Sequence, residues 1–409
     1  MEGKSKLIKV LLVHNFYGSE APSGENQVVV HDINLLRADG HEVVLFSRSS
    51  DFVRGIGLFG RILAGFSNVF NVWAAKELTE IIKGEQPDII HVHNTFPLIS
   101  LWVLYAVKRS VPIVMTLHNY RLFCSAGIPL RDGQICTKCI DKKSVLPALK
   151  YGCYKGSRLA TLPLAMSIWL HRLLGTLDRR VSAFITLTPY ARKKFVDAGL
   201  KEDRVFIRAN GFTPDHRGFS KGRDGITGSV LYVGRLSEEK GVLELVNAWR
   251  EMGSTAPRLV LIGDGELRKR IEREIETDRL NIVLGGVLSR NKVVELISQS
   301  QLVVIPSICI EGLPTVLVES FSVGTPVLVS NVGPLPTLVS NETGFVALSL
   351  RPEVFSQQIL EVLRDPEDLI KKGQKAREEY LDKYTDSRSL DILLNIYGSA
   401  MGDPGESND

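Results

Sequence analysis

The sequence predicts an α/β protein built from two doubly wound domains, each with a parallel sheet covered by helices. Three observations lead to this prediction. The chain has 409 residues, which is long for a single hydrophobic core. Short runs of Val, Ile and Leu, as expected for strands buried on both faces, alternate with segments of helical periodicity. This alternation pauses in a polar, Gly-rich stretch at 206–228, which we interpret as a hinge, and then starts again.

The elements follow one another in the order of a parallel sheet, with strand, loop, helix and strand in succession. The strand-like runs of the first half are "IKVLLVHNF", "HEVVLFS", "PDIIHVHN", "VPIVMTLHN" and "SAFITLT". Those of the second half are "GSVLYVGR", "PRLVLIGDG", "NIVLGGV", "QLVVIPS" and "PVLVSN". We therefore expect an N-terminal domain at 1–210, a C-terminal domain at 211–384, a helix at 385–402 that could pack back on the N-terminal domain, and a disordered tail at 403–409.

Charge is distributed unevenly along the chain. Residues 1–215 hold 28 Lys and Arg against 18 Asp and Glu, whereas residues 216–409 hold 22 against 28. A mild basic excess without an Arg-rich tract or an aromatic recognition motif argues against nucleic acid as a partner. It favours phosphate-bearing small molecules or an anionic membrane surface.

The N-terminus is a charged lead into a strand rather than a signal peptide, and no run of about 18 apolar residues occurs. We therefore expect a cytoplasmic protein. The segment "LATLPLAMSIWLHRLLGTLDRR" at 159–180 is too short to span a bilayer. It is either a core helix, which we favour, or a helix that lies on a membrane surface.

Two glutamates, Glu311 and Glu319, flank the expected start of a helix. Seven residues separate them, and Pro314 between them favours a helix that begins near Leu313–Pro314. A loop at the carboxyl end of a strand, followed by a helix N-terminus, suits a phosphate. Carboxylates beside such a site suit sugar or ribose hydroxyls. The alternative is one glutamate that caps its own helix and one that is simply exposed.

Two cations, Arg235 and Lys240, follow the strand that ends at Gly234. Together they could neutralise a diphosphate. The alternative is an exposed loop in which they pair with Glu238 and Glu239. The "IGDGE" turn is too short to count as a dinucleotide fingerprint.

An ordered set of motifs resembles the family 4 retaining glycosyltransferases, which have the GT-B fold. The donor-domain motifs are "VGRLSEEKGV", "LIGDGELR", "VLGGV", "PSICIEGLPTVLVES", "GTPVLVSN" and "NETGF". The acceptor-domain motifs are "SGENQVVVHDINLLRADGHEVVLFS", "PDIIHVHN", "VMTLHN" and "LTPYARKKF". The similarity spans nearly the whole chain, and the spaced glutamate pair is its most specific part.

The resemblance implies roles for the donor-domain residues. Arg235 and Lys240 would bind the donor diphosphate, Glu319 the ribose hydroxyls, and Glu311 the sugar hydroxyls beside the anomeric carbon. The stretch Gly312, Leu313, Pro314 and Thr315 would give backbone amides to the diphosphate or sugar, although Pro314 itself has no N–H. The base would lie near Gly286 and Val287. Two departures from the family pattern are Thr337, where a glutamate is frequent, and Phe212–Thr213, where an aliphatic–Asp pair is common.

In the acceptor domain, Gly24 matches a glycine that lets the first loop approach the phosphates, although Ser23 replaces its usual glycine partner. His118 matches a histidine that faces the donor sugar. Its position at the end of a strand is also compatible with a histidine that only lines the rim. Of His91 and His93 we expect one to point inward and one outward, with His93 nearer the ligand.

Four cysteines fall within one 30-residue segment that contains a Cys-x2-Cys pair. In a cytoplasmic protein this pattern indicates a structural zinc site. The alternatives are reduced thiols with packing roles, or a redox or disulfide pair. The candidate ligands are Cys124, Cys136, Cys139 and Cys153.

The resemblance implies metal-independent transfer of a sugar from a nucleotide-diphosphate sugar to a hydroxyl acceptor, with retention and no cofactor at the catalytic site. No Asp-x-Asp occurs as a ligand for a divalent ion. We expect a glycan or lipid-linked glycan acceptor, as in bacterial surface-polysaccharide assembly, and a peripheral position on the membrane. The alternatives are an epimerase or phosphorylase on the same fold, or an inactive protein that binds the nucleotide sugar. A dehydrogenase fits least, since no G-x-G-x-x-G is expected to open a helix after a strand.

Overall fold

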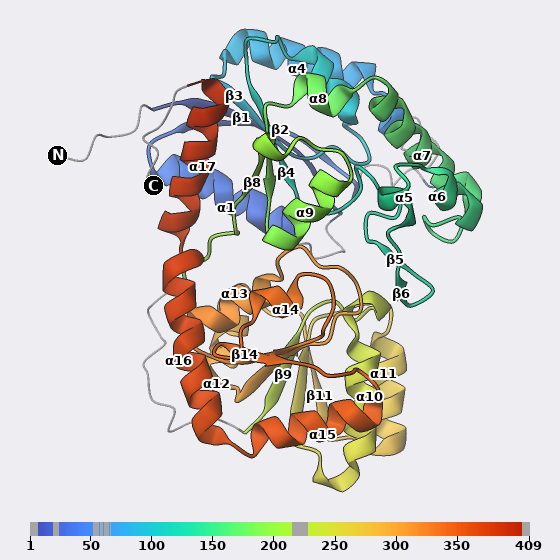
Figure 1. Cartoon of the computed structure of the whole chain (residues 1–409), viewed down its shortest axis with the longest axis vertical. Helices are drawn as coiled ribbons and strands as arrows, with labels where there is room; N and C mark the ends of the chain where they lie inside the picture. Colours follow the sequence, from blue (N-terminus) through green and yellow to red (C-terminus); the bar gives the residue numbers. More distant parts are fainter. Residues whose placement is uncertain are drawn as a thin grey trace, which may run out of the picture. The chain divides into compact units, whose positions relative to one another are not determined.

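The structure is a computed structural model and describes residues 7–18, 24–51, 57, 60, 65, 67–214 and 228–402 (Figure 1). The chain divides into two compact units. The first comprises Met1–Pro129, Thr137–Ala209 and Leu390–Asp409, and the second comprises Leu130–Cys136 and Asn210–Ser389. The expected tail at 403–409 and most of the Gly-rich stretch, 215–227, lie outside the described residues.

The first unit is built on a six-stranded sheet in the order β2-β1-β3-β4-β7-β8, and every neighbouring pair is parallel. Its strands are β1 (Lys9–Phe16), β2 (Glu42–Ser49), β3 (Ile89–Asn94), β4 (Ile113–Leu117), β7 (Ala183–Thr186) and β8 (Val205–Ile207). The chain leaves β1 toward β2 and later returns to β3 on the other side of β1. The loops after β1 and β3 therefore diverge, which is where open parallel sheets bind ligands.

Helices cover this sheet on both faces. They include α1 (Gly24–Ala38), α4 (Val72–Glu85), η1 (Leu101–Ala106), α5 (Lys138–Asp141), α6 (Leu146–Tyr151), α7 (Arg158–Leu173), α8 (Thr176–Arg180) and α9 (Pro189–Asp197). The strands β5 (Leu130–Arg131) and β6 (Gln134–Ile135) form a short antiparallel hairpin, which groups with the second unit. The last helix, α17 (Asp386–Met401), places Leu393, Ile396 and Tyr397 in the same hydrophobic cluster as β1, β4 and β7.

The second unit has a six-stranded parallel sheet in the order β11-β10-β9-β12-β13-β14. Its strands are β9 (Val230–Val233), β10 (Leu259–Ile262), β11 (Ile282–Gly286), β12 (Leu302–Ile305), β13 (Val327–Val329) and β14 (Gly344–Val346). Its helices are α10 (Val242–Met252), α11 (Arg268–Asp278), α12 (Arg290–Gln299), α13 (Thr315–Ser322), α14 (Leu335–Leu338), α15 (Pro352–Leu363) and α16 (Pro366–Lys383). This is the strand order of doubly wound dinucleotide-binding sheets, in which the order reverses at a switch point, here between β9 and β12. The predicted α/β class with two parallel, doubly wound sheets is confirmed.

The loops after β9 and β12 pack tightly against each other because glycine removes the side chain between them. Gly241 adopts a φ of +67°, and a Cβ there would collide with the carbonyl oxygen of Pro306. The Ile308 N–H donates to the Glu239 carbonyl at 3.1 Å, which joins the two loops directly. The side chains that follow these two strands are therefore held together at the switch point.

Candidate active site

An ion pair lies at the switch point of the second unit. The Nζ of Lys240, after β9, is 2.6 Å from Oε1 of Glu311, after β12. The hydroxyl of Ser307 donates to the same carboxylate oxygen at 2.6 Å. Lys240 thus pairs with Glu311 rather than with Glu238 or Glu239, and the carboxylate keeps a second oxygen for other partners.

The pair is held in its charged form. Burial by itself would raise the pKa of Glu311, but the Lys240 ammonium and the hydrogen bonds from Lys240 and Ser307 outweigh it, so the pKa lies below its usual value. Burial would likewise lower the pKa of Lys240, and the Glu311 carboxylate instead holds it above its usual value. At neutral pH the site therefore contains a fixed anion and a fixed cation side by side.

Arg235 is placed differently from Lys240. Its side chain is 53% exposed, and its Nη1 lies 3.4 Å from Oε1 of Glu239, which is a loose contact for an ion pair. Glu239 is itself held by the Ser237 hydroxyl at 2.7 Å. Exposed ion pairs of this kind contribute little to stability, so the guanidinium can turn to an incoming phosphate at small cost.

Glu319 lies in the second turn of α13 and is buried. The Nε of Arg290, the first residue of α12, donates to Glu319 Oε1 at 2.9 Å. Burial raises the pKa of Glu319 in spite of Arg290. The guanidinium of Arg290 also lies 4.2 Å from the centroid of the Phe212 ring. The unusual Phe212 therefore has a physical role, because it forms a face on which the partner of Glu319 stacks.

The other predicted donor residues lie at the ends of strands and at a helix start. Pro314 is the N-cap of α13 and no side chain caps this helix, so the first amides of the helix are open to a ligand. Gly286 ends β11 with a φ of +68°, and Val287 beside it is exposed. The structure thus places Arg235, Lys240, Glu311, Gly312, Leu313, Pro314 and Thr315 around one switch point, while Glu319, Gly286 and Val287 lie on the neighbouring elements.

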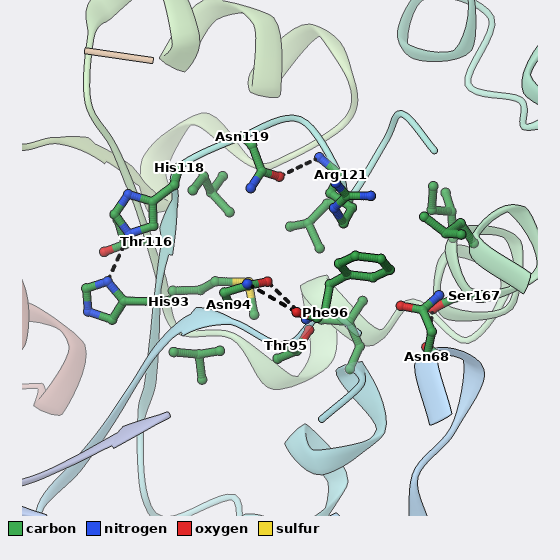
Figure 2. Close-up of a pocket in the computed structure, with 17 residues that line it drawn as sticks. Asn68, His93, Asn94, Thr95, Phe96, Thr116, His118, Asn119, Arg121 and Ser167 are labelled. Atoms are coloured by element: carbon green, nitrogen blue, oxygen red, sulfur yellow. Dashed lines mark hydrogen bonds between the residues drawn. The ribbon is translucent and has the colours of Figure 1, made fainter. Parts of the chain in front are cut away.

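His118 lies just after β4 in the first unit, in contact with His93 (Figure 2). Nδ1 of His93 is 2.9 Å from Nε2 of His118, and the two rings stack. The expectation that His91 and His93 point to opposite sides is wrong, since their ring centroids are only 4.1 Å apart. Residues two positions apart in a strand share one face of the sheet, and both histidines do so here.

These histidines are neutral at physiological pH. Burial, together with repulsion from neighbouring histidines, lowers the pKa of His118 to about 3. Burial also lowers the pKa of His91 to about 3 and that of His93 well below its usual value. His118 therefore offers a hydrogen bond and not a positive charge.

A pocket opens beside His118, with about 640 Å³ of space that includes open solvent. Strand ends and loop residues form one wall, and Leu164, Ser167 and Ile168 of α7 form another. The Arg121 guanidinium stacks on Phe96 at 4.1 Å from the ring centroid, within this lining. Figure 2 shows these side chains around one space. The pocket combines an apolar wall with polar groups at one end, which suits an amphiphilic ligand.

Gly24 is the first residue of α1, and Glu25 follows it. The side-chain amide of Asn119, in the loop that contains His118, donates to Oε2 of Glu25 at 3.3 Å. Burial raises the pKa of Glu25 to about 8, although the nearby Arg121 opposes this. The first loop and the His118 loop are thus brought together within the first unit.

The structure gives no support to a zinc site at Cys124, Cys136, Cys139 and Cys153. Within the described ranges, no group of three or more His, Cys, Asp or Glu side chains is placed to hold a metal ion. Cys124 and Cys139 are buried, whereas the other two are partly exposed. The zinc ion remains a prediction.

Sequence reasoning did not single out Ser307, Arg290 or Glu25 as parts of these sites. Ser307 follows the end of β12 and precedes Glu311 by four residues, so its position after a strand was a usable signal. Arg290 lies 29 residues before Glu319, and no local sequence pattern predicts their contact. Glu25 could have been recognised as a carboxylate in the first turn of a helix.

Comparison with known proteins agrees with this architecture. The sequence profile described as Glycosyltransferase Family 4 matches residues 22–216, and that described as Glycosyl transferases group 1 matches 219–379. TuaC of Bacillus subtilis, whose name describes a teichuronic acid biosynthesis glycosyltransferase, is 25% identical over 62% of this chain and 55% of its own length. The uncharacterized glycosyltransferase MJ1607 of Methanocaldococcus jannaschii is 22% identical over 89% of this chain and 91% of its own.

Among solved structures, that of Anabaena HepE in complex with UDP-glucose has a TM-score of 0.63 at 16% identity, and the match covers 97% of this chain and all of HepE. No helix in the described part of the chain has both the length and the hydrophobicity needed to cross a bilayer. With two family profiles matched in succession and two parallel-sheet units of GT-B type, the chain belongs to glycosyltransferase family 4 and is a glycosyltransferase.

Proposed function

We propose that the protein is a retaining, metal-independent glycosyltransferase that uses a UDP- or GDP-sugar as donor. The observation that carries this proposal is the Lys240–Glu311 pair at the switch point of the second sheet. Arg235 and the uncapped start of α13 lie on the same two loops. A cationic group, open helix amides and an ionised carboxylate match a diphosphate next to a sugar.

The proposed reaction follows from this charge arrangement. The bond between the anomeric carbon and the phosphate oxygen breaks, and the acceptor oxygen bonds to the same face of the sugar. The acceptor proton passes to the leaving phosphate oxygen. Arg235, Lys240 and the α13 amides stabilise the negative charge that develops on the diphosphate. Glu311 orients the sugar hydroxyls, and neutral His118 accepts a hydrogen bond from a sugar hydroxyl.

For the acceptor, we propose the hydroxyl of a lipid-linked glycan, in cell-surface polysaccharide biosynthesis at the cytoplasmic membrane face. Three observations support this choice. The name of TuaC refers to teichuronic acid biosynthesis. The pocket beside His118 has an apolar wall. The N-terminal half carries the basic excess that an anionic membrane surface attracts.

The test has two stages. A thermal-shift screen against nucleotide sugars identifies the donor, since a ligand at 100 times its Kd adds about 2.7 kcal/mol of stability. The purified chain is then incubated with that donor and a polyprenyl-diphosphate glycan, and NMR determines the anomeric configuration of the product. We expect retention of configuration with undiminished activity in EDTA. Epimerised donor without transfer, or donor binding without turnover, would overturn the proposal.

A further inference from the structure

Helix α7 presents large apolar side chains on two opposite faces. Its inner face is buried against the first unit and includes Leu164 and Ile168. Its outer face carries five large apolar side chains with exposures between 41% and 83%: Leu159, Leu162, Met166, Trp169 and Leu173. Their spacing of three, four, three and four residues places them in one stripe along the helix axis. We call these five residues the α7 stripe.

Packing in the hydrophobic core accounts for the apolar residues of the inner face only. The helix is therefore a core helix, as the sequence favours, and it also has the exposed apolar surface expected of a helix that lies on a membrane. At 16 residues the helix is about 24 Å long, so the stripe forms a continuous surface rather than scattered exposed residues. Contiguous exposed apolar surface of this kind marks an interaction site.

The charges around the stripe identify the partner. Residues 142–177 contain no Asp or Glu and hold six cations, Lys142, Lys143, Lys150, Lys155, Arg158 and Arg172. Arg158 is exposed, and the helical repeat places it directly beside the stripe. Lys155 precedes the helix and is exposed as well. An apolar stripe bordered by cations fits a surface with an apolar interior and anionic groups above it.

A second copy of the chain fits this surface less well than a membrane does. A symmetric dimer through the stripe would bring together two surfaces that both carry the exposed cations Lys155 and Arg158, and like charges oppose such an approach. Trp169, exposed in the C-terminal half of the helix, has the amphipathic side chain that is enriched at membrane interfaces. An anionic lipid bilayer satisfies both the apolar and the charged part of the surface.

We propose that the α7 stripe docks on an anionic lipid bilayer, with the helix axis parallel to the membrane plane. Such helices bury their apolar face about 5–10 Å into the headgroup region. The opposite face of the same helix lines the pocket beside His118, through Leu164, Ser167 and Ile168. Docking therefore holds this pocket close to the bilayer. The inference rests on the proposed function only in its link to a lipid-linked acceptor; the docking surface stands on α7 itself (Figure 1).

The test uses the full chain and vesicles of phosphatidylcholine with phosphatidylglycerol, without donor or acceptor. We expect co-sedimentation at low salt that weakens at high salt. Leu162→Glu with Trp169→Glu should abolish it, whereas Leu348→Glu with Leu381→Glu, at exposed apolar positions of the second unit, should leave it unchanged. Each neutralisation of Lys150, Lys155 or Arg158 to Gln should weaken vesicle binding about fivefold.

A second measurement avoids charged substitutions in the helix. In a Trp73→Phe chain, tryptophan fluorescence should shift to the blue on vesicle binding, and brominated lipids should quench it. Trp169→Phe should remove that response. No binding to anionic vesicles, binding that ignores the α7 substitutions, or a dimer that buries Trp169 would each overturn the proposal. Because Glu311→Gln should bind vesicles normally, failure of docking and failure of catalysis remain distinguishable.

Discussion

Lys240 and Glu311 are 71 residues apart in the chain, and yet Nζ of the one lies 2.6 Å from Oε1 of the other. The contact exists because β9 and β12 are neighbours in the sheet and Gly241 lets their loops touch. Each charge favours the ionised state of the other. A donor diphosphate that arrives here meets a lysine whose charge is already partly balanced, and a carboxylate that is already oriented.

We expect Glu311→Gln to lower kcat by about 100-fold or more, because the amide cannot supply the negative charge that faces the reacting sugar. The change conserves shape, so far-UV circular dichroism should remain that of the parent chain. The free energy of unfolding should fall by about 1–3 kcal/mol, because Lys240 loses the carboxylate with which it pairs. Steady-state transfer assays with the donor found in the thermal-shift screen measure the effect. Glu238→Gln, an exposed carboxylate three residues after Arg235, is the matched control. Near-normal turnover in Glu311→Gln would contradict the assignment.

Arg235→Ala and Lys240→Ala should each weaken nucleotide-diphosphate binding by about 1.5–3 kcal/mol. Their effects on stability should differ. Arg235 is 53% exposed and loosely paired, so its loss should leave the free energy of unfolding unchanged. Loss of Lys240 leaves Glu311 without its cation and should cost about 1–3 kcal/mol of folding stability. Calorimetric titration with UDP and GDP measures the loss of binding, and urea unfolding measures the loss of stability. Equal stability of both variants would show that the ion pair contributes nothing to the fold.

Most of both sheets could be predicted from the sequence, because strands buried on both faces appear as runs of Val, Ile and Leu. The short edge strands β8 (Val205–Ile207) and β14 (Gly344–Val346) were not predicted, since three residues are too few to form a recognisable run. The helix start at Pro314 could also be predicted, since proline has few other places in such a pattern. What local pattern could not supply was pairing across the sheet. The partner of Lys240 depends on which strands are neighbours, and the sequence offered only the adjacent Glu238 and Glu239 as alternative partners.

The histidines show the same limit in another form. Side chains alternate between the two faces of a strand, so His91 and His93, two residues apart, must share a face of β3. The prediction that they point to opposite sides did not respect this period. Their partners, Tyr397 at 2.7 Å from His91 Nδ1 and His118 beside His93, come from elements far along the chain. The two faces of α7 were likewise ambiguous, because a core face and a membrane face have the same composition.

The zinc prediction can be tested directly. About one zinc per chain is expected if Cys124, Cys136, Cys139 and Cys153 bind it, although the described residues show no assembled metal group. Elemental analysis of protein purified without chelator measures the metal. Cys136→Ser with Cys139→Ser should remove it, while Cys309→Ser, at a buried cysteine outside the segment, should not. Absence of zinc together with four titratable thiols in the folded chain would reject the site.

His118 should carry its proton on Nε2. His93 Nε2 lies 4.0 Å from the carboxylate of Asp32, which favours a proton on that nitrogen. The Nδ1 of His93 is then an acceptor, so His118 Nε2–H must be the donor across their 2.9 Å contact. Nδ1 of His118 would remain as an acceptor for a sugar hydroxyl. Two-bond ¹⁵N–¹H correlation spectra of the histidine rings at pH 7 measure the tautomer, with a His118→Gln chain to assign its signals. An Nδ1-protonated His118 would contradict this hydrogen-bond order.

Acidification should destabilise the fold through the same histidines. Burial lowers the pKa of His14 to about 4 and the pKa values of His91 and His118 to about 3, so the unfolded chain binds protons that the folded chain excludes. The stability that these histidines contribute is therefore fully present above the pKa of an unfolded histidine, about 6.5. It falls as the pH drops from there toward the folded pKa values, by up to about 1.4 kcal/mol per pH unit for each histidine. Glu25 has the opposite effect, because burial raises its pKa to about 8. Between its usual pKa and 8 the folded chain holds this proton more tightly than the unfolded chain does, so acidification there adds stability.

Urea unfolding at several pH values between 4 and 7.5 measures this dependence. His91→Gln removes one buried imidazole, so its free energy of unfolding should fall less steeply with acidification, by about 1.4 kcal/mol per pH unit between pH 6 and 4. At pH 7.5 the imidazoles are neutral in both states, and the difference between the two chains there reports only the lost contacts with Tyr397 and Thr116. Parallel pH curves for the two chains would mean that His91 is not excluded from protonation in the folded state.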